Sequence, residues 1–182
     1  MAYLDIQVGL EDGQQDKDTN KNKKQRVLIE LASTALPNTC ANFMALCING
    51  KEGYESSKVF KIEPKVGICL GDVTAKNNGE NGSCHSSAAV GEMHYSDTFA
   101  HESLVLSHAQ KGMVSMLSTG LDKNDSRFVI TTVDDAPHLD GKLVAFGRVT
   151  EGLHVLEDLV ANVYTKKGRP TVNIEVVSCG VL

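Results

Sequence analysis

Proline and tryptophan are scarce in this chain: its 182 residues include four prolines and no tryptophan. So little proline excludes collagen-like and proline-rich low-complexity proteins. No apolar run approaches the ~20 residues that a membrane-spanning helix needs. The opening Met1 to Asp5 lacks the basic and apolar segments of a secretory leader. We therefore expect neither membrane insertion nor secretion, and a cytoplasmic location.

Paired cysteine motifs are also missing. The five cysteines are odd in number, scattered along the chain, and never spaced as C-x-x-C. Such a set signals neither a disulfide framework nor a zinc ribbon. The cysteines therefore favour a reducing compartment.

A basic surface is not signalled, because 18 Lys and Arg stand against 23 Asp and Glu, for a net charge of −5. The basic residues form no extended patch interleaved with aromatics, so we expect no nucleic-acid partner. What is present is ordinary: 41% hydrophobic residues, 23% charged residues and 16 glycines. These proportions are typical of a soluble globular protein, and the length fits one domain over residues 1–182.

The apolar spacing is mostly that of strands. Leu4, Ile6 and Val8 alternate with other residues at the start, and a second strand follows at 26–31. Between them, 11–24 is almost wholly polar and predicts a solvated loop, with a docking tail as the alternative. Further β-like segments fall at 59–62, 66–70, 105–106, 113–116, 128–132, 143–149 and 172–177.

Two segments have helical spacing. Pro37 suits the first turn of a helix that carries apolar residues as far as Cys47, and a second apolar stripe runs from Glu151 to Asn162. About eight strands and two helices predict a mostly β fold, a closed eight-stranded antiparallel barrel with one helix capping each open end. The predicted core includes Ile6, Leu31, Phe43, Leu46, Met116, Phe128, Phe146, Leu156 and Ile174.

Several short motifs occur in a distinctive order. They read PNTCANF at 37–43, VFKIEP at 59–64, GDVT at 71–74, GMVSM at 112–116, DSRFVIT at 125–131 and LDGKLVAFGRVTEG at 139–152. Taken together, the chain resembles the cyclophilins, the cyclosporin-binding peptidyl-prolyl isomerases, over nearly its whole length. Relative to a compact member of that family, the chain carries insertions at about 11–24 and about 83–97.

The resemblance implies a particular chemistry. Rotation about a prolyl peptide bond breaks amide resonance, at a barrier of about 18–20 kcal/mol. Cyclophilins are understood to favour the twisted bond with an arginine guanidinium at the prolyl amide and an apolar, aromatic pocket for the ring. This needs neither proton transfer nor a covalent intermediate. Accordingly the sequence shows no Ser/His/Asp or paired-carboxylate constellation, and we expect no cofactor.

The groove positions carry different side chains from those of an ordinary cyclophilin. Lys61 stands at the arginine position and lacks the planar guanidinium fork. The positions of the proline pocket hold no aromatic residue; they are Val66, Gly67, Val129, Leu139 and Leu143. The resemblance therefore predicts a groove that has lost much of its catalytic machinery.

The remaining groove positions follow the same trend. Two glutamine positions hold Cys69 and Arg127, and the run that receives the peptide backbone is Leu117, Ser118 and Thr119. His138 falls at the tryptophan position associated with cyclosporin, which argues against cyclosporin binding. Arg127 could replace the missing guanidinium from the opposite wall.

The six histidines raise a metal hypothesis, because His85 and His94 lie near Cys84. Metal sites need ligands at constrained spacings, and an adjacent Cys-His without a matching second pair does not supply them. We therefore expect no metal site. Segment 83–97 is instead predicted to pack as a loop on the barrel or on a partner.

Two functional classes remain open. Since the motifs that build the fold are retained while the groove is altered, the favoured hypothesis is a protein-binding or structural subunit of a larger assembly. Family analogy suggests a cytoskeletal assembly such as a ciliary radial spoke. The alternative is a slow or specialised prolyl isomerase that uses Lys61 and Arg127. Fold alone does not decide between them.

Overall fold

The computed structural model describes residues 1–9, 24–74, 84–86, 94–96, 98–120 and 122–182. Most of the two predicted insertions, at 11–24 and 83–97, therefore lies outside the described residues. Within the second, only two short backbone segments are described: β5 (Cys84–Ser86) and β6 (His94–Ser96) pair antiparallel.

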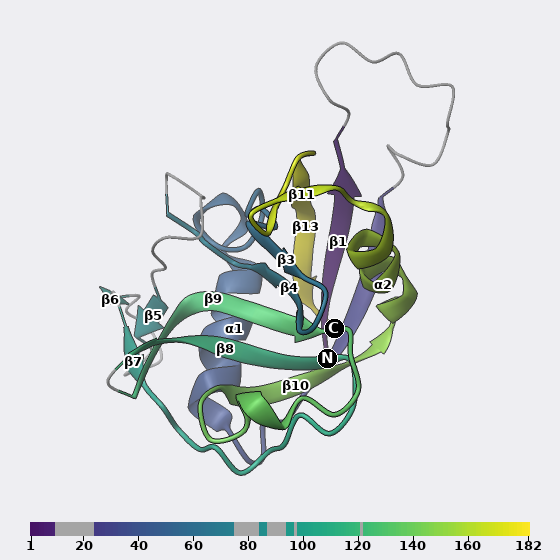
Figure 1. The fold of residues 1–182 in the computed structure, drawn as a ribbon. Coiled ribbons are helices and arrows are strands. Elements are labelled where there is room, and N and C mark those ends of the chain that lie inside the picture. Colours follow the sequence, from purple (N-terminus) through teal and green to yellow (C-terminus); the bar gives the residue numbers. More distant parts are fainter. Residues whose placement is uncertain (10–23, 75–83, 87–93, 97, 121) are drawn as a thin grey trace.

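One antiparallel sheet of nine strands forms most of the described molecule (Figure 1). Its hydrogen-bonded order is β13 (Ile174–Val181), β1 (Ala2–Val8), β2 (Gln25–Leu31), β10 (Val144–Glu151), β8 (Met113–Gly120), β9 (Lys123–Thr131), β4 (Gly67–Leu70) and β3 (Lys61–Glu63), and β7 (Phe99–Ala100) pairs with β9. The long β8–β9 hairpin includes the predicted strands at 113–116 and 128–132. Residues 105–106, predicted as a strand, are irregular.

The sheet curls into a half-barrel, so the prediction of a closed eight-stranded barrel is wrong. In the described residues the edge strands β3 and β13 share no ladder. The chain before β3 contacts β13 through an isolated bridge between Lys58 and Glu175 and through three backbone hydrogen bonds. The Val59 amide donates to the Ile174 carbonyl at 2.8 Å, the Ser56 amide to the Val176 carbonyl at 2.7 Å, and the Val176 amide to the Ser57 carbonyl at 2.9 Å. The irregular chain before β3 thus connects the two edges of the half-barrel by backbone hydrogen bonds.

Both predicted helices are present. Helix α1 (Pro37–Ile48) packs against β13, and α2 (Leu153–Asn162) packs against β2 and β4. Helix α2 begins two residues later than predicted, because Glu151 still belongs to β10 and Gly152 makes the turn at φ +83°. A Cβ at Gly152 would lie 2.2 Å from the Arg26 carbonyl oxygen, so only glycine fits there. No helix in the described part of the chain is long and apolar enough to cross a membrane.

The start of α1 is capped from a distance. None of its own side chains caps it, but Glu102 accepts hydrogen bonds from the amides of Asn38 (3.0 Å) and Thr39 (2.7 Å). Partial burial of the Glu102 carboxylate raises its pKa, but these hydrogen bonds outweigh burial and leave the pKa below its ordinary value. A carboxylate at a helix N-terminus satisfies the free amides and the helix dipole together.

Aromatic rings fill the interior of the half-barrel. The Phe43 ring on α1 lies 5.0–5.3 Å, centroid to centroid, from the rings of Tyr54, Phe128 and Phe146. The Tyr54 hydroxyl donates to the buried Ser126 carbonyl at 2.8 Å, so its polar atom is satisfied. The predicted core is confirmed, with Leu31 half-buried at its margin and the other members buried.

Candidate functional site

The outer face of the sheet forms the floor of the candidate site. Because successive side chains of a strand point to opposite faces, Phe128 in β9 enters the core and Val129 faces outward. Cys69 lies opposite Val129 in the β4–β9 register, and Leu117 follows on β8. These three outward side chains line one cavity.

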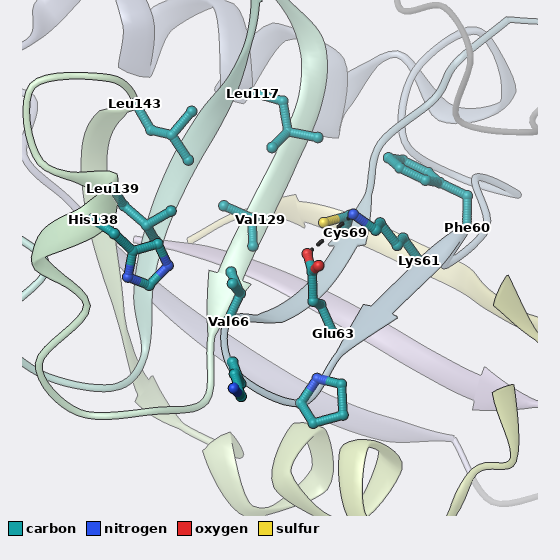
Figure 2. A pocket seen from close by; sticks show the side chains of 12 residues that line it. Phe60, Lys61, Glu63, Val66, Cys69, Leu117, Val129, His138, Leu139 and Leu143 are labelled. Atoms are coloured by element: carbon teal, nitrogen blue, oxygen red, sulfur yellow. Dashed lines mark hydrogen bonds and ion pairs between the residues drawn. The ribbon is translucent and has the colours of Figure 1, made fainter. Parts of the chain in front are cut away.

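One wall of this cavity comes from β3 and the chain beside it. Lys61 lies opposite Cys69 in the β3–β4 register, and Phe60 and Val66 flank the strand. The Lys61 ammonium is 3.0 Å from a carboxylate oxygen of Glu63, and both side chains are 46% exposed. Figure 2 shows the Lys61 and Glu63 side chains meeting across the cavity edge.

The opposite wall comes from the short 3-10 helix η2 (Pro137–Leu139) and Leu143. A buried histidine holds this loop: the His108 ring places Nδ1 2.7 Å from Asp140 Oδ1 and Nε2 2.7 Å from Ser115 Oγ. The backbone amide of His108 also donates to Asp140 Oδ1 at 2.8 Å. These hydrogen bonds lower the pKa of Asp140, so the carboxylate stays charged and anchors the wall.

The cavity between these walls has a volume of about 700 Å³ and is mostly apolar. Figure 2 shows Val66 and Val129 between the two walls, with Phe60 on one side and Leu139 on the other. Its lining residues are Phe60, Lys61, Glu63, Pro64, Lys65, Val66, Cys69, Leu117, Val129, His138, Leu139 and Leu143. A cavity of this size and apolar lining falls within the range of ligand-binding pockets.

The structure brings most of the predicted groove residues together. Eight of them line the cavity: Lys61, Val66, Cys69, Leu117, Val129, His138, Leu139 and Leu143. Four do not. Gly67 supplies only backbone, since a Cβ there would lie 2.0 Å from the Ile130 carbonyl oxygen, and the Ser118 and Thr119 hydroxyls bond to the Lys123 carbonyl at the far end of β8.

Arg127 is the fourth predicted groove residue that does not line the cavity, and it pairs with a carboxylate instead. It shares the outward face of β9 with Val129, yet its Nη2 lies 2.6 Å from Asp125 Oδ2 and its Nε 2.9 Å from the same oxygen. The Asp125 side chain is 2% exposed and that of Arg127 14% exposed. Breaking such a buried pair would leave a carboxylate without its partner, which is strongly unfavourable.

The Cys69 thiol in the groove is not suited to act as a nucleophile. Burial raises the pKa of Cys69 to about 12, although the Lys61 charge opposes this shift. Cys69 is therefore a protonated, inert thiol at neutral pH.

The metal hypothesis falls mostly on side chains that are not described. The side chains of Cys84, His85 and His94 lie outside the described residues. Where side chains are described, no group of three His, Cys, Asp or Glu could hold a metal ion.

Sequence reasoning missed two groups that shape the site, His108 and Asp140. Part of their signal was present, since His108 lies between the predicted strands at 105–106 and 113–116, and Asp140 belongs to the motif at 139–152. The hydrogen bonds between them follow from the fold and not from spacing, because 32 residues separate them.

Comparisons with known proteins agree with this geometry. The family model described as "Cyclophilin type peptidyl-prolyl cis-trans isomerase/CLD" matches residues 17–181. The chain is 31% identical over 167 residues to peptidyl-prolyl cis-trans isomerase B of Saccharomyces cerevisiae, covering 91% of this chain and 77% of that protein.

Two other relatives are longer proteins. The chain is 32% identical to the NK-tumor recognition protein of Homo sapiens, covering 92% of this chain and 11% of that protein. It is 30% identical to peptidyl-prolyl cis-trans isomerase D of Mycosarcoma maydis, covering all of this chain and 44% of that protein. Since the family model spans nearly the whole sequence, the chain belongs to the cyclophilin-type peptidyl-prolyl cis-trans isomerase family.

Proposed function

We propose that this chain is a cyclophilin-type protein-binding domain, whose groove holds apolar, proline-containing segments of partner proteins and isomerises them slowly. One observation carries the proposal: both cations expected to act on a prolyl amide are occupied by carboxylates. Lys61 pairs with Glu63 at 3.0 Å, and Arg127 pairs with Asp125 at 2.6 Å. Neither presents a free planar donor set to the cavity.

Binding needs less from the groove than catalysis does. Burial of apolar surface contributes about 25 cal/mol per Å² without any directed donor. Val66, Val129, Leu139 and Leu143 offer such a surface to a proline ring. The aliphatic wall therefore supports recognition of an apolar segment.

Slow isomerisation follows from the groups that would act on the twisted bond. Removing one preorganised donor from a catalytic site typically costs about 10²–10³ in rate. Lys61 is a point charge on a flexible stem, and a neighbouring carboxylate competes for it. We expect turnover to fall by at least this factor.

A prolyl isomerase of ordinary or specialised activity is the second candidate. The printed names of the relatives from Saccharomyces cerevisiae and Mycosarcoma maydis support it. The pair between Lys61 and Glu63 is half exposed, and exposed pairs contribute only about 0–1 kcal/mol, so substrate can open it. Arg127 is less available because its pair with Asp125 is buried.

The larger assembly remains part of the proposal. We place the chain with protein partners in the cytoplasm, in a cytoskeletal or ciliary complex. Cross-linking followed by mass spectrometry of the tagged protein in cells tests this placement, and partners drawn only from other compartments would reject it.

The groove function is tested by NMR with a short peptide in which apolar residues flank one proline. We expect the peptide to shift the amide resonances of Cys69, Leu117 and Val129, while exchange between its cis and trans forms is accelerated far less than by an ordinary cyclophilin. Acceleration comparable to that of an ordinary cyclophilin would favour the second candidate. No shift at millimolar peptide would reject both candidates for this groove.

A matched pair of variants locates the binding. Leu143→Lys places a charge in the apolar cavity and should abolish the shifts, because an unpaired charge resists desolvation. Val105→Lys makes the same kind of change at a side chain that is 71% exposed and does not line this cavity, and should leave binding intact. Equal losses in the two variants would contradict the assignment.

A further inference from the structure

A positively charged surface borders the groove on the β3 side, although the chain as a whole carries a net charge of −5. Six exposed cations, which we name the basic rim, come from the chain around β3 and from the hairpin of β11 (Thr165–Lys166) and β12 (Arg169–Pro170). They are Lys58, Lys61, Lys65, Lys166, Lys167 and Arg169.

The fold joins these two sets of cations. The Ile62 amide donates to the Gly168 carbonyl at 2.7 Å, so the hairpin lies directly against β3. Gly168 is close enough to Lys61 that an added Cβ would sit 3.5 Å from its Cγ. Lys61 therefore stands between the hairpin and the apolar cavity, and Figure 1 shows β11 beside β3.

The rim and the groove share a wall. Phe60 lines the apolar cavity on one side and, on the other, a second hollow of about 370 Å³ that is also lined by Lys58 and Arg169. Lys61 and Lys65 line the apolar cavity itself. An extended segment lying in the groove would thus pass from aliphatic side chains directly onto cations.

The β11–β12 hairpin places two cations directly opposite each other, an arrangement that does not stabilise the hairpin. Lys166 and Arg169 are directly opposite one another in the β11–β12 register. Like charges directly opposite in an antiparallel pair are destabilising. In the described part of the chain, two carboxylates lie beside rim cations, Glu63 beside Lys61 and Glu175 opposite Lys58, against six cations in the rim.

From this juxtaposition we propose that the preferred partner segment carries Asp or Glu residues beside its apolar, proline-containing stretch. The apolar part lies in the cavity and the carboxylates lie on the basic rim. This inference rests on the groove function proposed above, and it names the partner chemistry of that same groove.

Calorimetric titration tests it with three synthetic peptides of equal length. The first peptide is neutral, with a proline between apolar residues. The second has two aspartates on the N-terminal side of that proline, and the third has two aspartates on its C-terminal side. We expect one of the acidic peptides to bind about five- to tenfold more tightly than the neutral peptide at low salt, since exposed charge pairs are individually weak. In 0.5 M salt the gain should disappear.

Two double variants separate the rim from the net charge of the protein. Lys166→Glu with Arg169→Glu should abolish the acidic preference and leave affinity for the neutral peptide unchanged. Lys51→Glu with Lys123→Glu makes the same change in net charge at exposed positions that line neither hollow, and should keep most of the preference. Circular dichroism and the melting temperature check that each double variant folds.

The outcomes distinguish this inference from the groove function. If all peptides bind equally, or if both double variants lose the preference equally, only the acidic specificity is wrong. If no peptide binds, the groove function fails as well. Binding of the unmodified protein to vesicles containing 30% phosphatidylserine, without any acidic-peptide gain, would assign the rim to a membrane surface and overturn the inference.

Discussion

The two faces of strands β4, β8 and β9 differ sharply in what they carry. The inner face contributes Phe128 to a cluster of aromatic rings at 5.0–5.3 Å, with every ring fully buried. The outer face, one residue away along the same strand, carries Val129 and an aliphatic groove. Aromatic rings therefore pack on the inner face, whereas the groove on the outer face is lined mainly by aliphatic side chains.

Interior packing explains the asymmetry. Removing a large side chain from a closed core loses burial energy and leaves a cavity, whereas an open groove simply refills with water. Substitutions on the inner face should therefore cost more stability than substitutions in the groove. The predictions for Phe128, Leu139 and Lys61 test this difference, those for Asp5 and Glu102 measure contacts elsewhere in the fold, and the last prediction tests the function.

The largest expected effect is on the inner face. Phe128→Ala should lower the free energy of unfolding by about 3–5 kcal/mol, because its ring is fully buried against the rings of Phe43 and Tyr54. Leu139→Ala, in the half-exposed groove wall, should cost no more than about half as much. Urea denaturation of both variants measures the difference. Similar losses of unfolding free energy in the two variants would contradict the proposed difference between the faces.

An ion pair between the buried Asp5 carboxylate on β1 and the half-exposed Arg26 guanidinium on β2 provides the next test. Burial of Asp5 raises its pKa, but hydrogen bonds from Arg26 and Lys24 outweigh burial and hold the pKa below its ordinary value. A lowered pKa in the folded protein adds stability above the pKa of the unfolded chain, near 3.9, and that stability is lost at lower pH. Asp5→Asn should therefore cost about 1.5–3 kcal/mol at pH 7.

The same variant should come progressively closer to the unmodified protein as the pH falls below the ordinary pKa of aspartate, because protonation of Asp5 removes the charge that asparagine lacks. Denaturation midpoints from pH 7 downward measure this convergence. A gap of constant size across the range would mean that Asp5 acts through packing instead of charge.

The cap on α1 should have a smaller effect. Glu102→Ala removes the acceptor for the Asn38 and Thr39 amides, and loss of a helix cap typically costs about 0.5–2 kcal/mol. Thermal unfolding measures it. Val105→Ala, an exposed change three residues later, serves as the control and should have no measurable effect.

The smallest effect is expected in the groove. Lys61→Arg should change the free energy of unfolding by less than about 0.5 kcal/mol, since the side chain is half exposed and both residues can pair with Glu63. A loss above about 1 kcal/mol would show that the outer face also bears on stability.

Periodicity alone predicted much of the inner face. Strand alternation and the two apolar stripes identified both helices and a core that is confirmed apart from the half-buried Leu31. Closure of the barrel was wrong because β3 and β13 share no ladder in the described residues. The segment 59–62 was predicted as a strand, but its pattern could not show that Lys58 and Val59 meet β13 only through isolated contacts.

The groove was predicted only in part for a related reason. Motif positions placed Lys61, Val129 and Leu139 on one cavity. The ion pair between Arg127 and Asp125 is local, because the two residues are two positions apart in β9 and share a face, so strand alternation could have indicated it. The cap from Glu102 is a tertiary contact, set by the fold rather than by local spacing.

The central claim is that groove chemistry has changed while the scaffold has been kept. Its most direct test is the rate of cis–trans exchange of a proline peptide, measured by NMR for this chain and for a cyclophilin that has the arginine. Two variants of this chain are measured beside them: Lys61→Arg alone, and a triple variant with Lys61→Arg, Val66→Phe and Val129→Phe. Arg127 stays unchanged, because removing it would leave Asp125 buried without its guanidinium.

We predict turnover at least about a thousandfold below the arginine-bearing relative, from lost donors whose effects are not additive. The triple variant should recover more of this deficit than Lys61→Arg alone. Turnover by the unmodified protein within about tenfold of the relative would contradict the account, since a lysine paired with Glu63 and an aliphatic pocket would then suffice for catalysis.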